Sequence, residues 1–282
     1  VDDYSIFHSS YFRFSRNKSV KNITTVYDFT YELHIKGLSA KFHKMQKGLA
    51  IKNASGIICI SESTKKDLLS FYPDLDSETI RVIYLAASDC YYKINNLDIL
   101  ETRFASLKGK KILSFVGKRI KYKNFSLAVN MLKNLPKEYH LVIIGGGDLN
   151  NDEIDLLSFI EKRFTHFKNV NSEELNIVYN ISFCYLYLSE YEGFGIPVLE
   201  AMQAGCPVLA QNISSIPEVY GKVDNLVMNI NSVSECCEKI LRLEEVTYRK
   251  KVIDQGIRNA ENFSWDKTFN QTFDFYNYVN DL

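Results

Sequence analysis

The chain has 282 residues, of which 46% are hydrophobic and 24% are charged, and its 34 basic and 34 acidic side chains leave no net charge. This composition is typical of a globular protein with a real core, and it argues against a general polyanion-binding protein such as a nucleic-acid binder. No apolar run approaches the ~20 residues of a membrane span. The six cysteines show neither CxxC pairs nor zinc spacing, so we expect a reduced, cytoplasmic protein.

The first hundred residues alternate between two periodicities. Strands are predicted at residues 4–10, 22–29, 55–61 and 79–86, and helices at residues 31–54 and 62–72. This β–α–β alternation implies parallel strands with helices on the faces of the sheet. The unit has no opening strand followed by a glycine-rich turn, so we expect its front to be missing. Residues 89–109 are polar and mixed, which is typical of a linker.

The alternation restarts at Lys111 and continues to the end of the chain. Strands are predicted at residues 111–117, 140–146, 184–189 and 207–212, and helices at residues 125–135, 151–164, 197–205, 231–243 and 264–282. Ser232 and Glu235 fit a capping box at the start of one of these helices. We therefore predict an α/β protein with two Rossmann-like domains, the first incomplete, that have parallel sheets with helices on both faces.

Residues 189–203, "SEYEGFGIPVLEAMQ", place two carboxylates at the junction of a strand and a helix. Ligands of open parallel sheets bind beyond the carboxyl ends of the strands. Gly193 and Gly195 let the backbone approach a ligand, and Glu200, in the first helical turn, can accept hydrogen bonds from a ribose diol. Glu192, on the opposite lip, can meet a sugar hydroxyl. The alternative is an ordinary turn with a glutamate that complements the helix dipole.

Residues 116–124, "VGKRIKYKN", form a basic loop that also follows a strand and precedes a helix. The guanidinium of Arg119 and the ammonium of Lys123 suit a diphosphate, and Asn124 suits a helix cap. The alternative is a solvated basic loop.

A third strand ends in "IIGGGD", residues 143–148. It is not a dinucleotide fingerprint, because Asn150 stands where the last glycine of GxGxxG belongs. Cations, carboxylates and exposed backbone at neighbouring strand ends together describe a ligand with a diphosphate, a ribose and another polyol. The sequence therefore indicates a nucleotide-sugar site.

With these motifs the chain resembles the retaining glycosyltransferases of family 4 (glycosyl transferases group 1), which have the two-domain GT-B fold. The resemblance runs along nearly all 282 residues, and its most specific part is "EGFGIPVLE", with two glutamates separated by seven residues. The other matching segments are "VGKRIKYKN", "AIKNASGIICISESTKKDL", "SSIPEV" and "FSWDKTFNQTFDFY".

The resemblance implies a division into an acceptor-side domain at residues 1–95, a nucleotide-sugar domain at residues 96–262, and a terminal helix at residues 263–282 that packs back on the first domain. It also implies the donor site. Its diphosphate loop would comprise Arg119, Lys123 and Asn124, Glu200 would hold the ribose, and Glu192 with the backbone of Gly193, Phe194 and Gly195 would hold the sugar.

Two departures from the family pattern affect the expected site. Tyr27 stands where the family often has a histidine, before Asp28, and His8 is the nearby substitute that we consider beside Asp28 on the sugar or acceptor side. The glycine-rich loop that helps to close over the donor is absent from these 282 residues.

We therefore expect an enzyme that moves a hexose, with a lean to mannose, from a GDP- or UDP-linked donor to a hydroxyl of a glycan or lipid-linked acceptor. Glu192 is its candidate catalytic carboxylate, and no metal or other cofactor is expected. The expected setting is surface polysaccharide synthesis, with peripheral association at the inner face of the membrane. One alternative is another enzyme of the same fold, a nucleotide-sugar epimerase or a phosphorylase, although no lysine motif for the pyridoxal cofactor of a phosphorylase stands out. The other is a non-catalytic GT-B subunit that binds a glycan or a partner.

Overall fold

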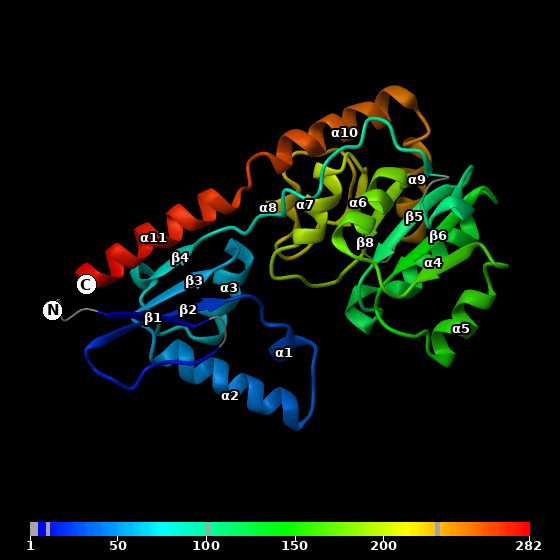
Figure 1. The fold of residues 1–282 in the computed structure, drawn as a ribbon. Coiled ribbons are helices and arrows are strands. Elements are labelled where there is room, and N and C mark those ends of the chain that lie inside the picture. The colour runs from blue at the N-terminus through cyan, green and yellow to red at the C-terminus, as the bar shows by residue number, and fades with distance from the viewer. Residues whose placement is uncertain (1–4, 10–11, 100–101, 229–231) are drawn as a thin grey trace. The chain divides into compact units, whose positions relative to one another are not determined.

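The computed structural model describes residues 5–9, 12–99, 102–228 and 232–282 (Figure 1). Two compact α/β units make up the chain. Unit 1 comprises residues 1–86, 191–195 and 263–282, and unit 2 comprises residues 87–190 and 196–262. Every strand pairing among the described residues is parallel, so the predicted α/β class with two parallel sheets is confirmed.

Unit 1 is built on a four-stranded sheet of order β1-β2-β3-β4. Its strands are β1 (Ser5–Ser9), β2 (Val20–Val26), β3 (Gly56–Cys59) and β4 (Ile80–Val82), and its helical elements before residue 87 are α1 (Thr30–Leu33), α2 (Leu38–Lys52), α3 (Glu62–Phe71) and the 3-10 helix η1 (Ser77–Thr79). The single helix predicted at residues 31–54 is wrong. It is split into α1 and α2 because Gly37, with φ of 107°, leaves the helical region between them.

The terminal helix α11 (Trp265–Asp281) lies along the side of this sheet opposite α2 (Figure 1). Phe275 and Val279 share a core cluster with three isoleucines, Ile23, Ile58 and Ile83. Gly56 permits this close approach, since a Cβ there would lie 2.5 Å from Val279 Cγ2. Ser264 begins the helix by accepting a hydrogen bond from the Lys267 N–H.

Unit 2 is built on a six-stranded sheet of order β10-β9-β8-β5-β6-β7. Its strands are β5 (Lys111–Val116), β6 (Tyr139–Ile144), β7 (Phe164–Phe167), β8 (Cys184–Tyr187), β9 (Val208–Gln211) and β10 (Leu226–Val227). The chain builds outward from β5 in one direction and then returns to build outward from β8 in the other. Because crossovers between parallel strands are right-handed, this reversal puts helices on both faces of the sheet.

The helices of unit 2 connect and cover these strands. They are η3 (Ala105–Leu107), η4 (Lys121–Lys123), α4 (Phe125–Asn134), α5 (Asn151–Ser158), α6 (Ser172–Ile181), α7 (Ile196–Gln203), α8 (Ile216–Tyr220), α9 (Val233–Arg242) and α10 (Val246–Ala260). The predicted helix at residues 151–164 is too long. Glu161 and Lys162 have positive φ values of 48° and 62°, which end the helix and start β7, a strand that the sequence pattern did not reveal.

Two further predictions need correction. At α9, the hydroxyl of Ser232 accepts a hydrogen bond from the Glu235 N–H, but the Glu235 carboxylate accepts from the Met228 N–H, so half of the capping box is formed. The units also divide at residue 86, not 95. The backbone N–H groups of Tyr92 and Ile94 bond to asparagine side chains of α6, which ties this stretch to unit 2.

Candidate functional site

The strand order of unit 2 reverses between β5 and β8, and this switch point is where doubly wound sheets bind ligands. Residues 117–124 follow the carboxyl end of β5, and residues 188–190 follow that of β8. The two loops meet, because the Glu190 N–H donates to the carbonyl oxygen of Tyr122 at 2.7 Å. The candidate site of unit 2 is therefore the edge formed by these loops.

Arg119, one of the two predicted diphosphate ligands, is turned into the protein. Its guanidinium donates to the carbonyl oxygens of Gly145 and Asp148 at 2.8 and 2.9 Å, and its Nε lies 3.0 Å from Glu153 Oε1. The side chain is only 2% exposed. These contacts place Arg119 beneath the loop, where its guanidinium is committed to the protein.

The "GGGD" loop, residues 145–148, supplies the carbonyl oxygens that bind the Arg119 guanidinium. Gly145, Gly146 and Gly147 all have φ between 72° and 76°, a left-handed conformation that glycine adopts without steric cost. A Cβ on Gly146 would clash with Arg119 Nη1 and lie 2.6 Å from the carbonyl oxygen of Gly117. The glycine run thus serves a close approach between the loops after β5 and β6.

Lys123 lies at the switch point. Its ammonium is 5.4 Å from the ring centroid of Tyr187, the last residue of β8, and 5.7 Å from that of Tyr122. Lys118 in the same loop is exposed and is a second cation that the sequence analysis missed, although its place directly after Gly117 was a visible signal. Asn124 precedes α4 in a left-handed conformation and its side chain makes no capping hydrogen bond, so the predicted side-chain cap is wrong.

Glu200 lies on α7, in its fifth position and not in the first turn as predicted. Its Oε2 accepts a hydrogen bond from the Tyr179 hydroxyl at 3.2 Å. Burial raises the pKa of Glu200, and burial followed by the Glu200 charge raises the pKa of Tyr91 to about 12. Both tyrosines therefore stay protonated beside this carboxylate. They escaped the sequence analysis because α6 was not predicted and Tyr91 lies in the supposed linker.

The segment Tyr191–Gly195, which contains Glu192, belongs to unit 1. A Cβ on Gly193 would overlap the carbonyl oxygen of Tyr27 and lie 2.9 Å from Asp28 Cβ, so the predicted residues Gly193 and Asp28 do lie side by side. Asp28 Oδ1 also accepts a hydrogen bond from the Thr30 N–H at 2.8 Å. Glu192 itself is half-buried, and Gly195 has a φ of 114°.

The candidate His8 has a structural environment. Its Nδ1 lies 2.6 Å from the Tyr276 hydroxyl and its Nε2 lies 2.8 Å from Thr25 Oγ1. Burial lowers the pKa of the imidazole. Both ring nitrogens are thus used in joining β1, β2 and α11, which argues against His8 as a sugar-side residue.

The family described as "Glycosyl transferases group 1" matches residues 98–259, which is more than half of the chain. The chain belongs to this glycosyltransferase family.

Individual proteins resemble the glycosyltransferase over most of its length. O-antigen chain mannosyltransferase B of Escherichia coli is 27% identical over 97% of this chain and 74% of its own. Among solved structures, sucrose-phosphate synthase of Thermosynechococcus elongatus has a TM-score of 0.79 at 18% identity, covering 98% of this chain and 74% of its own. HepE of Anabaena, in complex with UDP and glucose, has a TM-score of 0.78 at 18% identity, covering 92% and 72%. These neighbours confirm the GT-B fold.

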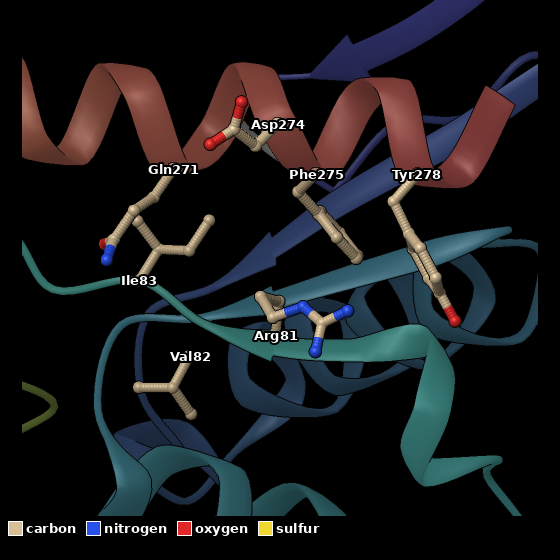
Figure 2. Close-up of a pocket in the computed structure, with 7 residues that line it drawn as sticks. All are labelled: Arg81, Val82, Ile83, Gln271, Asp274, Phe275 and Tyr278. Carbon is tan, nitrogen blue, oxygen red and sulfur yellow. The ribbon is translucent and has the colours of Figure 1, made fainter. Parts of the chain in front are cut away.

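The glycosyltransferase has a separate hollow in unit 1, between β4 and α11 (Figure 2). Figure 2 shows Arg81 reaching toward the rings of Phe275 and Tyr278, and its guanidinium carbon is 5.8 and 5.0 Å from their centroids. These cation–π contacts hold α11 to the edge strand. Because the cation is already engaged and the hollow lies beside the strand, we do not place the active site there.

The described part of the glycosyltransferase shows neither a metal-binding cluster nor a membrane-spanning helix. Residues 5–9, 12–99, 102–228 and 232–282 contain no group of three or more His, Cys, Asp or Glu side chains arranged to hold a metal ion. Within the same ranges, no helix has the length and hydropathy needed to cross a bilayer.

Proposed function

We propose that this glycosyltransferase is a retaining enzyme of family 4 that transfers a hexose from a nucleotide sugar to a hydroxyl of a glycan or lipid-linked acceptor. The observation that carries the proposal is the half-buried carboxylate of Glu200, on the helix that begins just after the switch point of unit 2. A carboxylate whose pKa is raised by burial gains most from a ligand that donates hydrogen bonds to it. The two hydroxyls of a ribose are such donors.

The residues of the two loops have different roles in this proposal. Lys123 balances the charge of the leaving diphosphate, and Lys118 is available in the same loop. Arg119 acts by holding that loop in place. Glu192 meets the donor sugar, with Gly193, Phe194 and Gly195 supplying backbone beside it.

The transfer breaks the bond between the anomeric carbon and the diphosphate oxygen. The acceptor oxygen bonds to the same face of that carbon, which retains its configuration, and the acceptor proton passes to the departing diphosphate. Lys123 stabilises the negative charge that develops during this step. In this proposal the transfer step uses no metal ion or other cofactor, because Lys123 supplies the positive charge at the diphosphate.

The names of related proteins support the finer choices. The mannosyltransferase named above favours mannose and surface polysaccharide synthesis, so GDP-mannose is the first donor to test. The complex of HepE with UDP and glucose keeps UDP-linked hexoses as the second choice. We propose a cytoplasmic location, with peripheral association at the inner face of the membrane where a lipid-linked acceptor would be presented.

Calorimetric titration with GDP and with UDP tests the nucleotide site directly. We expect one of them to bind, and Glu200→Gln to weaken it by about 10- to 100-fold, since hydrogen bonds to a charged group contribute about 1.5–3 kcal/mol. Glu173→Gln, an exposed carboxylate on α6, is the matched control and should bind as the wild type does. Equal affinity of Glu200→Gln and wild type would contradict the assignment.

A second experiment separates an enzyme from a binding protein. The intact natural protein is incubated with GDP-mannose and UDP-hexoses in the presence of a glycan acceptor, and the anomeric configuration of the product is read by NMR. Transfer with retention supports the proposal. Nucleotide binding without transfer or donor hydrolysis would instead support the alternative of a non-catalytic GT-B subunit.

A further inference from the structure

The Glu192 segment is attached to unit 1 through the side chain of Tyr191. The Tyr191 hydroxyl accepts a hydrogen bond from the Phe29 N–H at 2.9 Å and donates one to Asp67 Oδ2 at 2.7 Å. Burial, followed by the hydrogen bond to Asp67, raises the pKa of this phenol, so it remains a donor. One side chain thus joins the segment to the chain after β2 and to α3.

A second attachment lies on the other side of Glu192. Thr64, which is 1% exposed on α3, donates from its hydroxyl to the carbonyl oxygen of Gly193 at 3.2 Å. The same hydroxyl accepts from Ser61 Oγ at 2.9 Å, and it lies 3.4 Å from the carbonyl oxygen of Tyr27. Gly193 is pressed so closely on Tyr27 and Asp28 that no Cβ would fit.

A third attachment follows immediately. The ring of Phe194 is 5.8 Å from that of Tyr84 and 5.9 Å from that of Phe263, and Phe194 is 3% exposed. The residues on both sides of Glu192 are therefore fixed within unit 1, whereas Glu200 and Lys123 belong to unit 2.

We propose that Thr64, Tyr191 and Asp67 are positioning residues for Glu192, which fix the direction of its carboxylate relative to Asp28 on unit 1. This inference rests on the proposed function. The roles of the Tyr191 and Thr64 hydroxyls can be tested separately from packing, because Tyr191→Phe and Thr64→Val keep nearly the same side-chain volume. What they would lose is the hydrogen bonds of the Tyr191 hydroxyl with Phe29 and Asp67 and of the Thr64 hydroxyl with Gly193, which set the conformation of the segment.

The test compares Tyr191→Phe and Thr64→Val with wild type in the intact natural protein. We expect kcat for transfer to fall by about 10- to 100-fold, since small misplacements of a reacting group have effects of this size. The Kd for the nucleotide should change by less than about twofold, because the nucleotide residues lie on unit 2. Thr64→Ser keeps the hydroxyl and should restore kcat. Tyr276→Phe deletes a comparable phenol that bonds His8 and should leave kcat unchanged.

A double-mutant cycle distinguishes positioning from a general loss of structure. In a Glu192→Gln background, Tyr191→Phe should cause little further loss of kcat, because both changes act through one carboxylate. Hydrogen exchange of a peptide covering residues 191–195 should become faster in Tyr191→Phe and Thr64→Val, with peptides of unit 2 unchanged.

The outcomes separate the two proposals. If the wild type transfers hexose and the variants match it, or if the losses of Tyr191→Phe and Glu192→Gln multiply, the positioning role is overturned while the function stands. Unchanged exchange at residues 191–195 in both variants would also overturn it. If wild-type protein binds nucleotide but transfers no hexose, the proposed function and this role fail together.

Discussion

We expect the ionised carboxylate of Glu200 to lower the stability of the fold and to favour nucleotide binding. Burial raises its pKa above the ordinary value of 4.5, so the folded protein holds the proton more tightly than the unfolded chain does. As pH rises from about 4.5 through the folded pKa, the unfolded chain loses this proton before the folded protein does, and the free energy of unfolding falls. The Tyr179 hydrogen bond offsets part of this cost, and a ribose would offset more.

We therefore predict that Glu200→Gln is more stable than wild type at neutral pH although it binds nucleotide less well. The stability difference should grow as pH rises above about 4.5 and level off once pH exceeds the folded pKa of Glu200, which urea unfolding at a series of pH values would measure. The exposed Glu173→Gln provides the baseline. A stability difference that is constant with pH would mean that folding does not raise the pKa of Glu200.

At the scale of elements, the loops after β5 and β6 depend on one side chain. Arg119 joins the loop at residues 117–124 to the "GGGD" loop and, through Glu153, to α5. Arg119→Ala would leave a largely buried carboxylate and several carbonyl oxygens without their donor. We expect a loss of about 3–5 kcal/mol in the free energy of unfolding, as for other broken buried pairs.

Lys123→Ala is the matched comparison in the same loop. Lys123 makes cation–π contacts at the switch point, so we expect a smaller stability change and nucleotide binding weakened by about tenfold. Chemical unfolding and calorimetric titration of both variants measure the contrast. If Arg119→Ala keeps full stability but loses nucleotide affinity, Arg119 binds the nucleotide and does not hold the two loops together.

At the scale of the whole molecule, the two units should respond differently to nucleotide. A ligand present at 100 times its Kd stabilises the state that binds it by about 2.7 kcal/mol. Because Lys123 and Glu200 both belong to unit 2, we expect hydrogen exchange to slow in the core strands β5, β6 and β8. The core cluster of Ile23, Ile58 and Phe275 in unit 1 should change less. If hydrogen exchange slowed equally in both units, nucleotide binding would also depend on residues of unit 1.

The sequence pattern was a reliable guide where local chemistry decides the outcome. The buried strands β3, β6 and β8 are apolar runs in the sequence, and all three are strands in the structure. The pattern failed where backbone geometry interrupted it. Gly37 broke one predicted helix, and the positive φ values of Glu161 and Lys162 ended another and exposed β7 as a separate strand. Neither conformation leaves a signal in hydrophobic periodicity.

The sequence by itself determined the family, the parallel α/β architecture and the loops in which a nucleotide-sugar site belongs. These follow from periodicities and from residue types at strand ends, which act over a few residues. The tertiary structure decided which side chains are presented to a ligand. It turned the Arg119 guanidinium toward the carbonyl oxygens of Gly145 and Asp148, placed tyrosines beside Glu200, and attached the Glu192 segment to Thr64 and Asp67. These contacts join residues up to 129 positions apart, and only folding brings such partners within hydrogen-bond distance.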